Sequence, residues 1–158
     1  MYIKLFGSLL IALAGGVASF SFCRFQRKRL VVIDGYISLL FYIKGQIDCY
    51  SRPLSDILLG ADISLIESCG YRGGVPKSLS EMLPHAKIYL EDESMRLLMQ
   101  FSEEFGSTYK QEQLRRCDYY IEALLERRRL LCDEIPSKSK VGSAVWMCAS
   151  FALMIILW

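Results

Sequence analysis

The sequence predicts an all-α protein. A cytoplasmic bundle of about five or six helices (24–140) is flanked by an N-terminal transmembrane helix (1–23) and a C-terminal one (141–158). Three observations predict this class. Each end of the 158-residue chain carries an uncharged apolar run, the middle has apolar residues at helical spacing, and no stretch alternates like a strand.

The two apolar runs have the length of membrane spans. Leu5–Cys23 holds nineteen uncharged residues and Val141–Trp158 holds eighteen. As helices they would be about 27–28 Å long, close to the ~30 Å hydrocarbon core of a bilayer. One small core has no room to bury both runs, so spans are favoured over core helices. A cleaved signal peptide stays open for the first run, although only Lys4 precedes it and no clear A-x-A site follows.

Flanking charge predicts the orientation of both spans. Beyond the runs, on the far sides, the only base is Lys4. On the inner sides six bases lie next to the runs: Arg24, Arg27, Lys28, Arg29, Lys138 and Lys140. Positive charge close to a span stays on the cytoplasmic side. Residues 24–140 are therefore predicted to be cytoplasmic, with both termini on the other side of the cell membrane.

The middle segment excludes some classes of partner and site. It is close to neutral, which is unlike the strongly basic surface of a nucleic-acid binder. The six cysteines have no C-x-x-C spacing, and the single histidine, His85, is expected in an exposed turn. We therefore expect buried apolar cysteines, no metal and no cofactor.

The first helix of the bundle is predicted over 29–50, continuing from the first span because no proline intervenes before Pro53. Lys44 interrupts its apolar stripe. The other members of the stripe recur at steps of three and four: Leu30, Ile33, Ile37, Leu40 and Ile47.

Proline and glycine then divide the chain. One helix is expected over 53–70, ended by Gly70. A short helix follows, in which Ser78 and Glu81 match a capping box and which Pro84 should end.

Two more helices complete the predicted bundle. The helix over 90–106 opens with three acids, which suit the positive end of a helix dipole, and Gly106 should cap it. The last helix should begin after Thr108 and break at Pro136, with Arg128 at one place in its stripe. The expected stripes are Leu97, Leu98, Phe101 and Phe105 in the former, and Leu114, Cys117, Ile121, Leu124, Leu131 and Ile135 in the latter.

No catalytic motif is found: there is no G-x-S-x-G, no P-loop and no glycine-rich phosphate cradle after a strand. We predict no catalytic residue and no enzyme. The candidate partner-binding residues are the arginines of the last helix, Arg115, Arg116, Arg127 and Arg129. Arg127 and Arg129 are expected to project outward on either side of Arg128. These arginines either dock an acidic partner or form a solvated helix end near lipid headgroups.

Small residues recur every four positions in both apolar runs. Ser8, Ala12 and Gly16 form one such ridge, and Ala144, Cys148 and Ala152 form another. Ridges of this kind allow close helix approach in lipid.

Long stretches of the chain resemble the stage III sporulation protein AB family of endospore-forming bacteria. They are "IDCYSRPLSDIL" (47–58), "LEDESMRLLMQFSEEFGSTYKQEQL" (90–114) and the closing "KSKVGSAVWMCASFALMIILW". The resemblance covers nearly the whole chain. It departs over 69–87, which lacks the tryptophan expected there and is richer in Gly and Pro.

The resemblance implies a function. Family members belong to the channel complex between mother cell and forespore, and their soluble part is similar to cytoplasmic domains of the type II secretion and type IV pilus platform proteins. It implies a non-enzymatic platform on the mother-cell side that docks the sporulation ATPase-like protein AA and other channel proteins. The alternative is a membrane-anchored scaffold or regulator of another complex, without an ATPase partner.

Overall fold

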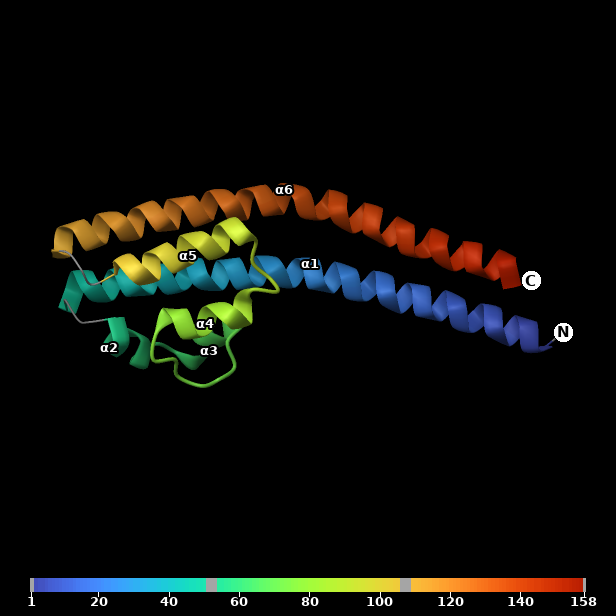
Figure 1. The fold of residues 1–158 in the computed structure, drawn as a ribbon, viewed down its shortest axis with the longest axis horizontal. Helices are drawn as coiled ribbons and strands as arrows, with labels where there is room; N and C mark the ends of the chain where they lie inside the picture. The colour runs from blue at the N-terminus through green and yellow to red at the C-terminus, as the bar shows by residue number, and fades with distance from the viewer. Residues whose placement is uncertain (1, 51–53, 106–108, 158) are drawn as a thin grey trace. The chain divides into compact units, whose positions relative to one another are not determined.

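The computed structural model describes residues 2–50, 54–105 and 109–157, and within these ranges the chain forms helices and no strand (Figure 1). This confirms the predicted all-α class. The six helices are α1 (Tyr2–Tyr50), α2 (Leu54–Leu59), α3 (Ile63–Ser68), α4 (Leu79–Ala86), α5 (Asp92–Glu104) and α6 (Lys110–Leu157).

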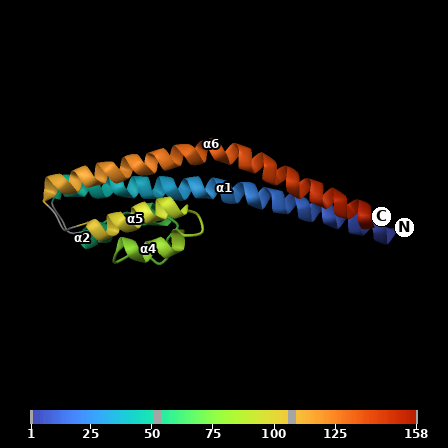
Figure 2. The same cartoon turned by 45° about the horizontal axis from the view of Figure 1, so that its top comes forward.

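The chain divides into two compact units. One is Arg29–Leu131, and the other combines Met1–Lys28 with Cys132–Trp158. Within Arg29–Leu131, α1 and α6 lie side by side in both views, with α5 next to them and α2, α3 and α4 gathered beside α1 (Figures 1 and 2). The predicted boundaries at residues 24 and 140 stay predictions.

Of the two long helices, α1 confirms its prediction and α6 does not. α1 runs through 49 residues without a break, as expected from the absence of proline. The predicted break at Pro136 is wrong, because α6 continues through it for 48 residues. Proline in a helix removes one hydrogen bond and costs roughly 3 kcal/mol. Packing on both sides outweighs this cost, since Ile135 is buried just before the proline and Gly142 lies close to the Phe22 ring beyond it.

The region expected to form one helix over 53–70 forms two six-residue helices instead. Asp62 interrupts the run because its side chain accepts a hydrogen bond from the Ser64 amide at 3.1 Å and caps α3. Gly70 ends this region as predicted: its φ is +86°, a conformation that favours glycine. Pro53 lies outside the described residues.

α4 begins where the sequence predicts, but its capping and its end differ from the prediction. Ser78 is its N-cap but forms no capping hydrogen bond through its side chain. The carboxylate of Glu81 accepts from the Lys77 amide at 2.9 Å and from the Tyr71 hydroxyl at 2.9 Å, so the capping box is wrong. Pro84 lies inside α4, since the buried residues Leu83 and Ala86 on either side hold the last turn in place.

α5 confirms the acidic start, because Glu91 is its N-cap and two more acids fill its first turn. Its predicted stripe is also confirmed: Leu98 and Phe101 are buried, and Leu97 and Phe105 pack against the core. Gly106 and Thr108 lie outside the described residues.

All six helices contribute buried side chains to the core, and the predicted stripes of α1 and α6 supply many of them. On α1, Leu30 packs against the core and the other four predicted members are buried. On α6, Leu114 packs against the core and five predicted members are buried: Cys117, Ile121, Leu124, Leu131 and Ile135. Burying a leucine such as Leu124, which is 0% exposed, contributes about 1.5–3 kcal/mol.

In the terminal unit, α1 and α6 approach closely at small residues, but these are not the residues of the predicted ridges. A Cβ added to Gly15 would lie 1.9 Å from the Ser150 Oγ, and one added to Gly142 would lie 2.4 Å from the Phe22 ring. The predicted Gly16 has no such neighbour within 4 Å.

The other residues of the two predicted ridges are either exposed or lie outside what the structure describes. Ala144, Cys148 and Ala152 of α6 are exposed. The side chains of Ser8 and Ala12 lie outside the described part.

One helical stretch in the described residues, Leu13–Tyr50, is long and apolar enough to cross a membrane by length and composition. Its apolar window has a mean hydropathy of 1.4 and is 50% buried. Core helices and N-terminal signal sequences also reach these values. The second predicted span stays a prediction.

Candidate docking surface on helix α6

The two cations that interrupt the apolar stripes form ion pairs between α1 and α6. Lys44 of α1 pairs with Asp118 of α6, and the hydrogen bond to Asp118 raises the pKa of Lys44. Arg128 of α6 pairs with Asp34 of α1, with a second contact at 3.3 Å from its terminal nitrogen. Asp34 precedes Lys44 by ten residues and Arg128 follows Asp118 by ten. Both pairs therefore fit a single antiparallel register.

Two of the four candidate arginines join α6 to α5. Arg116 pairs with Glu104 at 3.2 Å, and it also reaches Glu112 on its own helix at 3.4 Å. The Tyr120 hydroxyl donates to the same Glu104 at 3.0 Å. Burial, together with this hydrogen bond to a carboxylate, raises the pKa of Tyr120 to about 12. Arg116 thus helps to hold α5 in place.

The sequence led us to expect that Arg127 projects outward, and this expectation is wrong. Its guanidinium pairs with Glu93 of α5, and only 27% of its side chain is exposed. It lies on the side of α6 that α5 covers, because α5 reaches alongside this turn of the helix.

Arg115 and Arg129 are the exposed members of the candidate set, and the described residues provide no ion pair for either. They are fourteen residues apart, so both lie on nearly one face of α6, about 21 Å apart along its axis. Glu122 lies halfway between them, and it is also exposed. The exposed stripe Arg115–Glu122–Arg129 therefore alternates in charge, and it offers a partner two separated cations with an acid between them.

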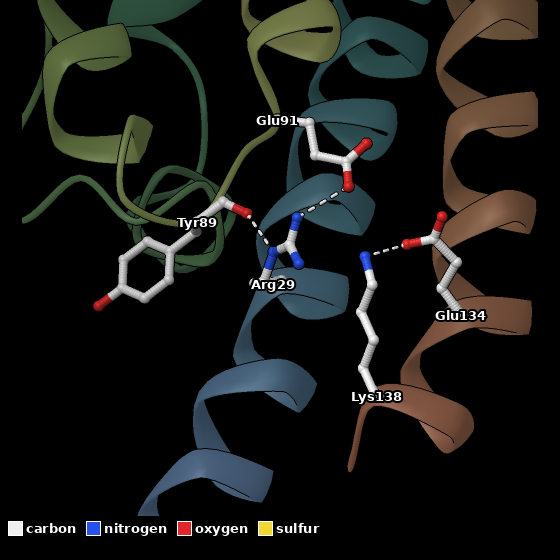
Figure 3. A network of polar contacts seen from close by, with 5 residues as sticks. All are labelled: Arg29, Tyr89, Glu91, Glu134 and Lys138. Atoms are coloured by element: carbon white, nitrogen blue, oxygen red, sulfur yellow. Dashed lines mark hydrogen bonds and ion pairs between the residues drawn. The ribbon is translucent and has the colours of Figure 1, made fainter. Parts of the chain in front are cut away.

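Bases near the first and second apolar runs also have partners (Figure 3). Arg29 donates from Nε to the Tyr89 carbonyl at 3.1 Å and from a terminal nitrogen to Glu91 at 2.9 Å. Because Glu91 is the N-cap of α5, Arg29 fixes the start of that helix. Within α6, Lys138 pairs with Glu134 one turn away.

The single histidine is exposed, as expected, but it lies in the last turn of α4 and not in a free turn. Its ring meets that of Tyr71 edge-on, with centroids 5.1 Å apart. The hydrogen bonds from the Lys77 amide and from Tyr71 lower the pKa of Glu81, while the bond to Glu81 raises the pKa of Tyr71. No nucleophile accompanies His85 in these contacts.

The cysteines only partly match the expectation that they are small buried residues. Cys69 and Cys117 are buried, and burial raises their pKa values to about 12 and about 11. Cys49 is exposed, so for this residue the expectation is wrong; Cys148, which lies in the second apolar run, is also exposed. The part of the chain that the structure describes holds no group of three or more His, Cys, Asp or Glu side chains placed to bind a metal ion.

Sequence reasoning missed the acids that engage these cations. A base inside an apolar stripe signals an acid on the facing helix, and this signal could have identified Asp34 and Asp118 once the antiparallel register was known. No comparable signal exists for Glu93 and Glu104, since they lie among other acids in α5.

The fold and the surface define a class: an all-helical protein, with a helix apolar enough for a membrane, whose polar surface shows charged contacts and no catalytic constellation among its described residues. The chain belongs to the stage III sporulation protein AB family, whose model matches residues 73–158. This confirms the suspected family and gives the chain a role in sporulation. Searches of curated proteins and of solved structures found no significant match.

Proposed function

We propose that this chain is a non-enzymatic membrane platform component of the mother cell–forespore channel complex in endospore formation. In this role it docks a cytoplasmic secretion-type ATPase, the sporulation ATPase-like protein AA. Family membership carries the proposal, because the matched residues 73–158 include α4, α5 and all of α6. Similarity of the bundle to the cytoplasmic domains of secretion platform proteins is part of the same proposal.

Apolar exposure in the terminal unit supports two membrane spans. Both helices of that unit expose large apolar side chains over several turns: Leu13, Val17 and Phe20 on α1, and Val141, Val145 and Trp146 on α6. In water such patches would be costly, whereas in a bilayer they face lipid. We propose that 1–23 and 141–158 both span the membrane, with 24–140 on the mother-cell side.

Within this proposal the ATPase contacts the arginine-bearing part of α6. Arg115 and Arg129 are exposed and can reach a partner directly. Arg116 and Arg127 belong to the same proposed surface, but their guanidinium groups are already bound to acids of α5. A partner must therefore bring acids that match two cations about 21 Å apart.

The test is a binding titration of purified ATPase against the full chain in lipid nanodiscs. Arg115→Glu with Arg129→Glu should weaken a salt-sensitive complex, because each attractive contact becomes a repulsive one. Arg127 is left unchanged, since Arg127→Glu would place two acids together at Glu93 and disturb the fold. Glu122→Arg is the opposite charge change on the same stripe and should strengthen binding of the ATPase. If both variants bind the ATPase as tightly as the wild type at two salt concentrations, the arginine surface of α6 (Arg115, Arg116, Arg127 and Arg129) is not the docking site.

One observation favours the alternative, a scaffold or regulator without an ATPase partner. The acid at Glu122 between the two exposed arginines reduces the attraction for an acidic surface. If the wild-type chain fails to bind the ATPase even at low salt, the scaffold role is preferred.

A further inference from the structure

An open groove of about 420 Å³ lies between α4 and α5. Leu83 and Pro84 line it from α4, and Met95 and Met99 line it from α5. The volume is in the range of ligand and side-chain binding sites. None of the contacts described for the arginine surface involves this groove.

The lining is mainly apolar and adaptable. Leu83 is buried at the base and Met95 is half-buried, while Met99 is 50% exposed. Methionine has a flexible, polarisable side chain, and grooves rich in it accept the apolar face of a helix. An exposed methionine beside an exposed proline leaves apolar surface without a cover in this chain.

Two opposite charges lie toward the two ends of the groove. Lys87 follows α4 at the connection to α5, and Glu103 lies in the last turn of α5. Along α5, Glu103 is eight residues beyond Met95, which corresponds to about 12 Å or two helical turns. In the described residues neither Lys87 nor Glu103 forms an ion pair, in contrast to Glu93 and Glu104 of the same helix. Both charges are therefore available to a partner.

We propose that the α4–α5 groove binds an amphipathic helix of a partner protein. Apolar side chains one turn apart on that helix would lie on Met95 and Met99, which are themselves four residues apart. An acidic side chain would meet Lys87, and a basic one would meet Glu103. A helix fits because Met95, Met99 and Glu103 follow one another at steps of four along α5 and form one ridge over two turns, against which a second helix can pack.

The test uses the full chain in nanodiscs of zwitterionic lipid, with methyl-labelled methionine observed by NMR. The probes are designed 18-residue helices with one leucine stripe, carrying mixed, all-acidic or all-basic end charges. A further probe has glutamine in place of each leucine. Empty nanodiscs correct for binding to lipid. The mixed peptide should shift the methyl signals of Met95 and Met99 and leave the buried Met82 unchanged.

Variants separate the groove from unspecific contact. Met99→Glu should weaken binding of the mixed peptide by about 10-fold, since it places a charge in the apolar lining of the groove. Ile63→Glu, which adds the same charge at an exposed apolar residue of α3, should leave binding unchanged. Lys87→Glu should weaken the mixed peptide by roughly 5-fold and strengthen the all-basic one by a similar factor.

Three results would overturn the proposal. The first is the absence of any shift at Met95 and Met99 with every leucine peptide. The second is a lack of specificity, seen either as an equal response to the leucine and glutamine peptides or as equal losses in Met99→Glu and Ile63→Glu. The third is a shift that follows the concentration of the chain alone, which would make a second copy the occupant.

Discussion

Gly35 lies where α3 approaches α1, and its replacement by alanine tests that contact. A Cβ at this position would lie 2.6 Å from the carbonyl carbon of Ser68 and 2.7 Å from its oxygen. Both are backbone atoms, so α3 must shift to make room. Gly45 is a matched control ten residues further along α1, because a Cβ there meets nothing within 4 Å.

The expected magnitudes follow from two opposing effects. Alanine in place of glycine inside a helix stabilises the protein by about 0.5–1 kcal/mol. Forcing an extra carbon into a packed contact costs about 1–3 kcal/mol, and a backbone neighbour puts Gly35 toward the upper end. Gly45→Ala should therefore raise the free energy of unfolding, and Gly35→Ala should lower it by about 1–2 kcal/mol.

Thermal unfolding of the full chain in detergent micelles, followed by helical circular dichroism, measures the difference. A gap of about 2 kcal/mol corresponds to roughly 4–8 °C between the two variants in a chain of this size. If Gly35→Ala and Gly45→Ala stabilise the protein equally, α3 does not lie against α1 at Gly35, and the packing described above is wrong.

Further predictions concern the core, the ion pairs, pH and topology. The predicted cytoplasmic segment alone should be soluble and helical, and Leu124→Ala should cost it about 2–5 kcal/mol in a urea titration; a negligible loss would contradict its place in the core. Arg128→Leu alone should lower the unfolding free energy by about 1 kcal/mol, because Asp34 loses its partner. Adding Asp34→Leu should recover most of this loss in the same assay, and an additive double variant would argue against the pair. Burial raises the pKa of Cys69 from 9.0 to about 12, so the thiol ionises at lower pH in the unfolded chain than in the folded one. The free energy of unfolding should therefore be constant below pH 9.0 and decline from there toward pH 12. In Cys69→Ala this decline should be less steep. In intact cells, an impermeant thiol reagent should label the exposed Cys49 only after permeabilisation, and labelling beforehand would overturn the cytoplasmic assignment.

Much of the helical framework was predictable because apolar periodicity reports burial directly. The stripes of α5 and α6 point to the core at the residues that the spacing indicated, for example Phe101 and Leu124. The same reasoning identified Gly70 and the acidic start of α5, because both follow from the chemistry of helix ends.

Helix boundaries were less predictable, since local signals compete with packing. Proline at 84 and 136 indicates a helix end in an isolated segment, yet buried neighbours carry both helices through. Glu81 had a suitable spacing for a capping box, but Tyr71 and the Lys77 amide bind its carboxylate. The Tyr71 contact is tertiary, and the sequence contains no signal for it.

The candidate surface was the hardest part to predict, because a row of arginines does not show which of them is already bound. Arg127 and Arg129 are two residues apart, but one pairs with α5 and the other is exposed. The difference depends on where α5 lies around α6, which only the tertiary structure provides. One basic segment therefore contains both an arginine that pairs within the bundle and an arginine that is exposed.

The charges inside the apolar stripes suggest why this simple bundle has one arrangement. If leucine replaced Lys44 and Arg128, α1 and α6 would pack equally well in several registers, because a shift of one turn brings similar apolar side chains together. A shift by one turn would instead separate both cations from Asp118 and Asp34. Each half-exposed pair contributes only about 0.2–1 kcal/mol, but every wrong register loses both pairs and leaves charges against apolar surface. We therefore expect the two pairs to act on the choice of register more than on stability, as polar groups do in other helical packings.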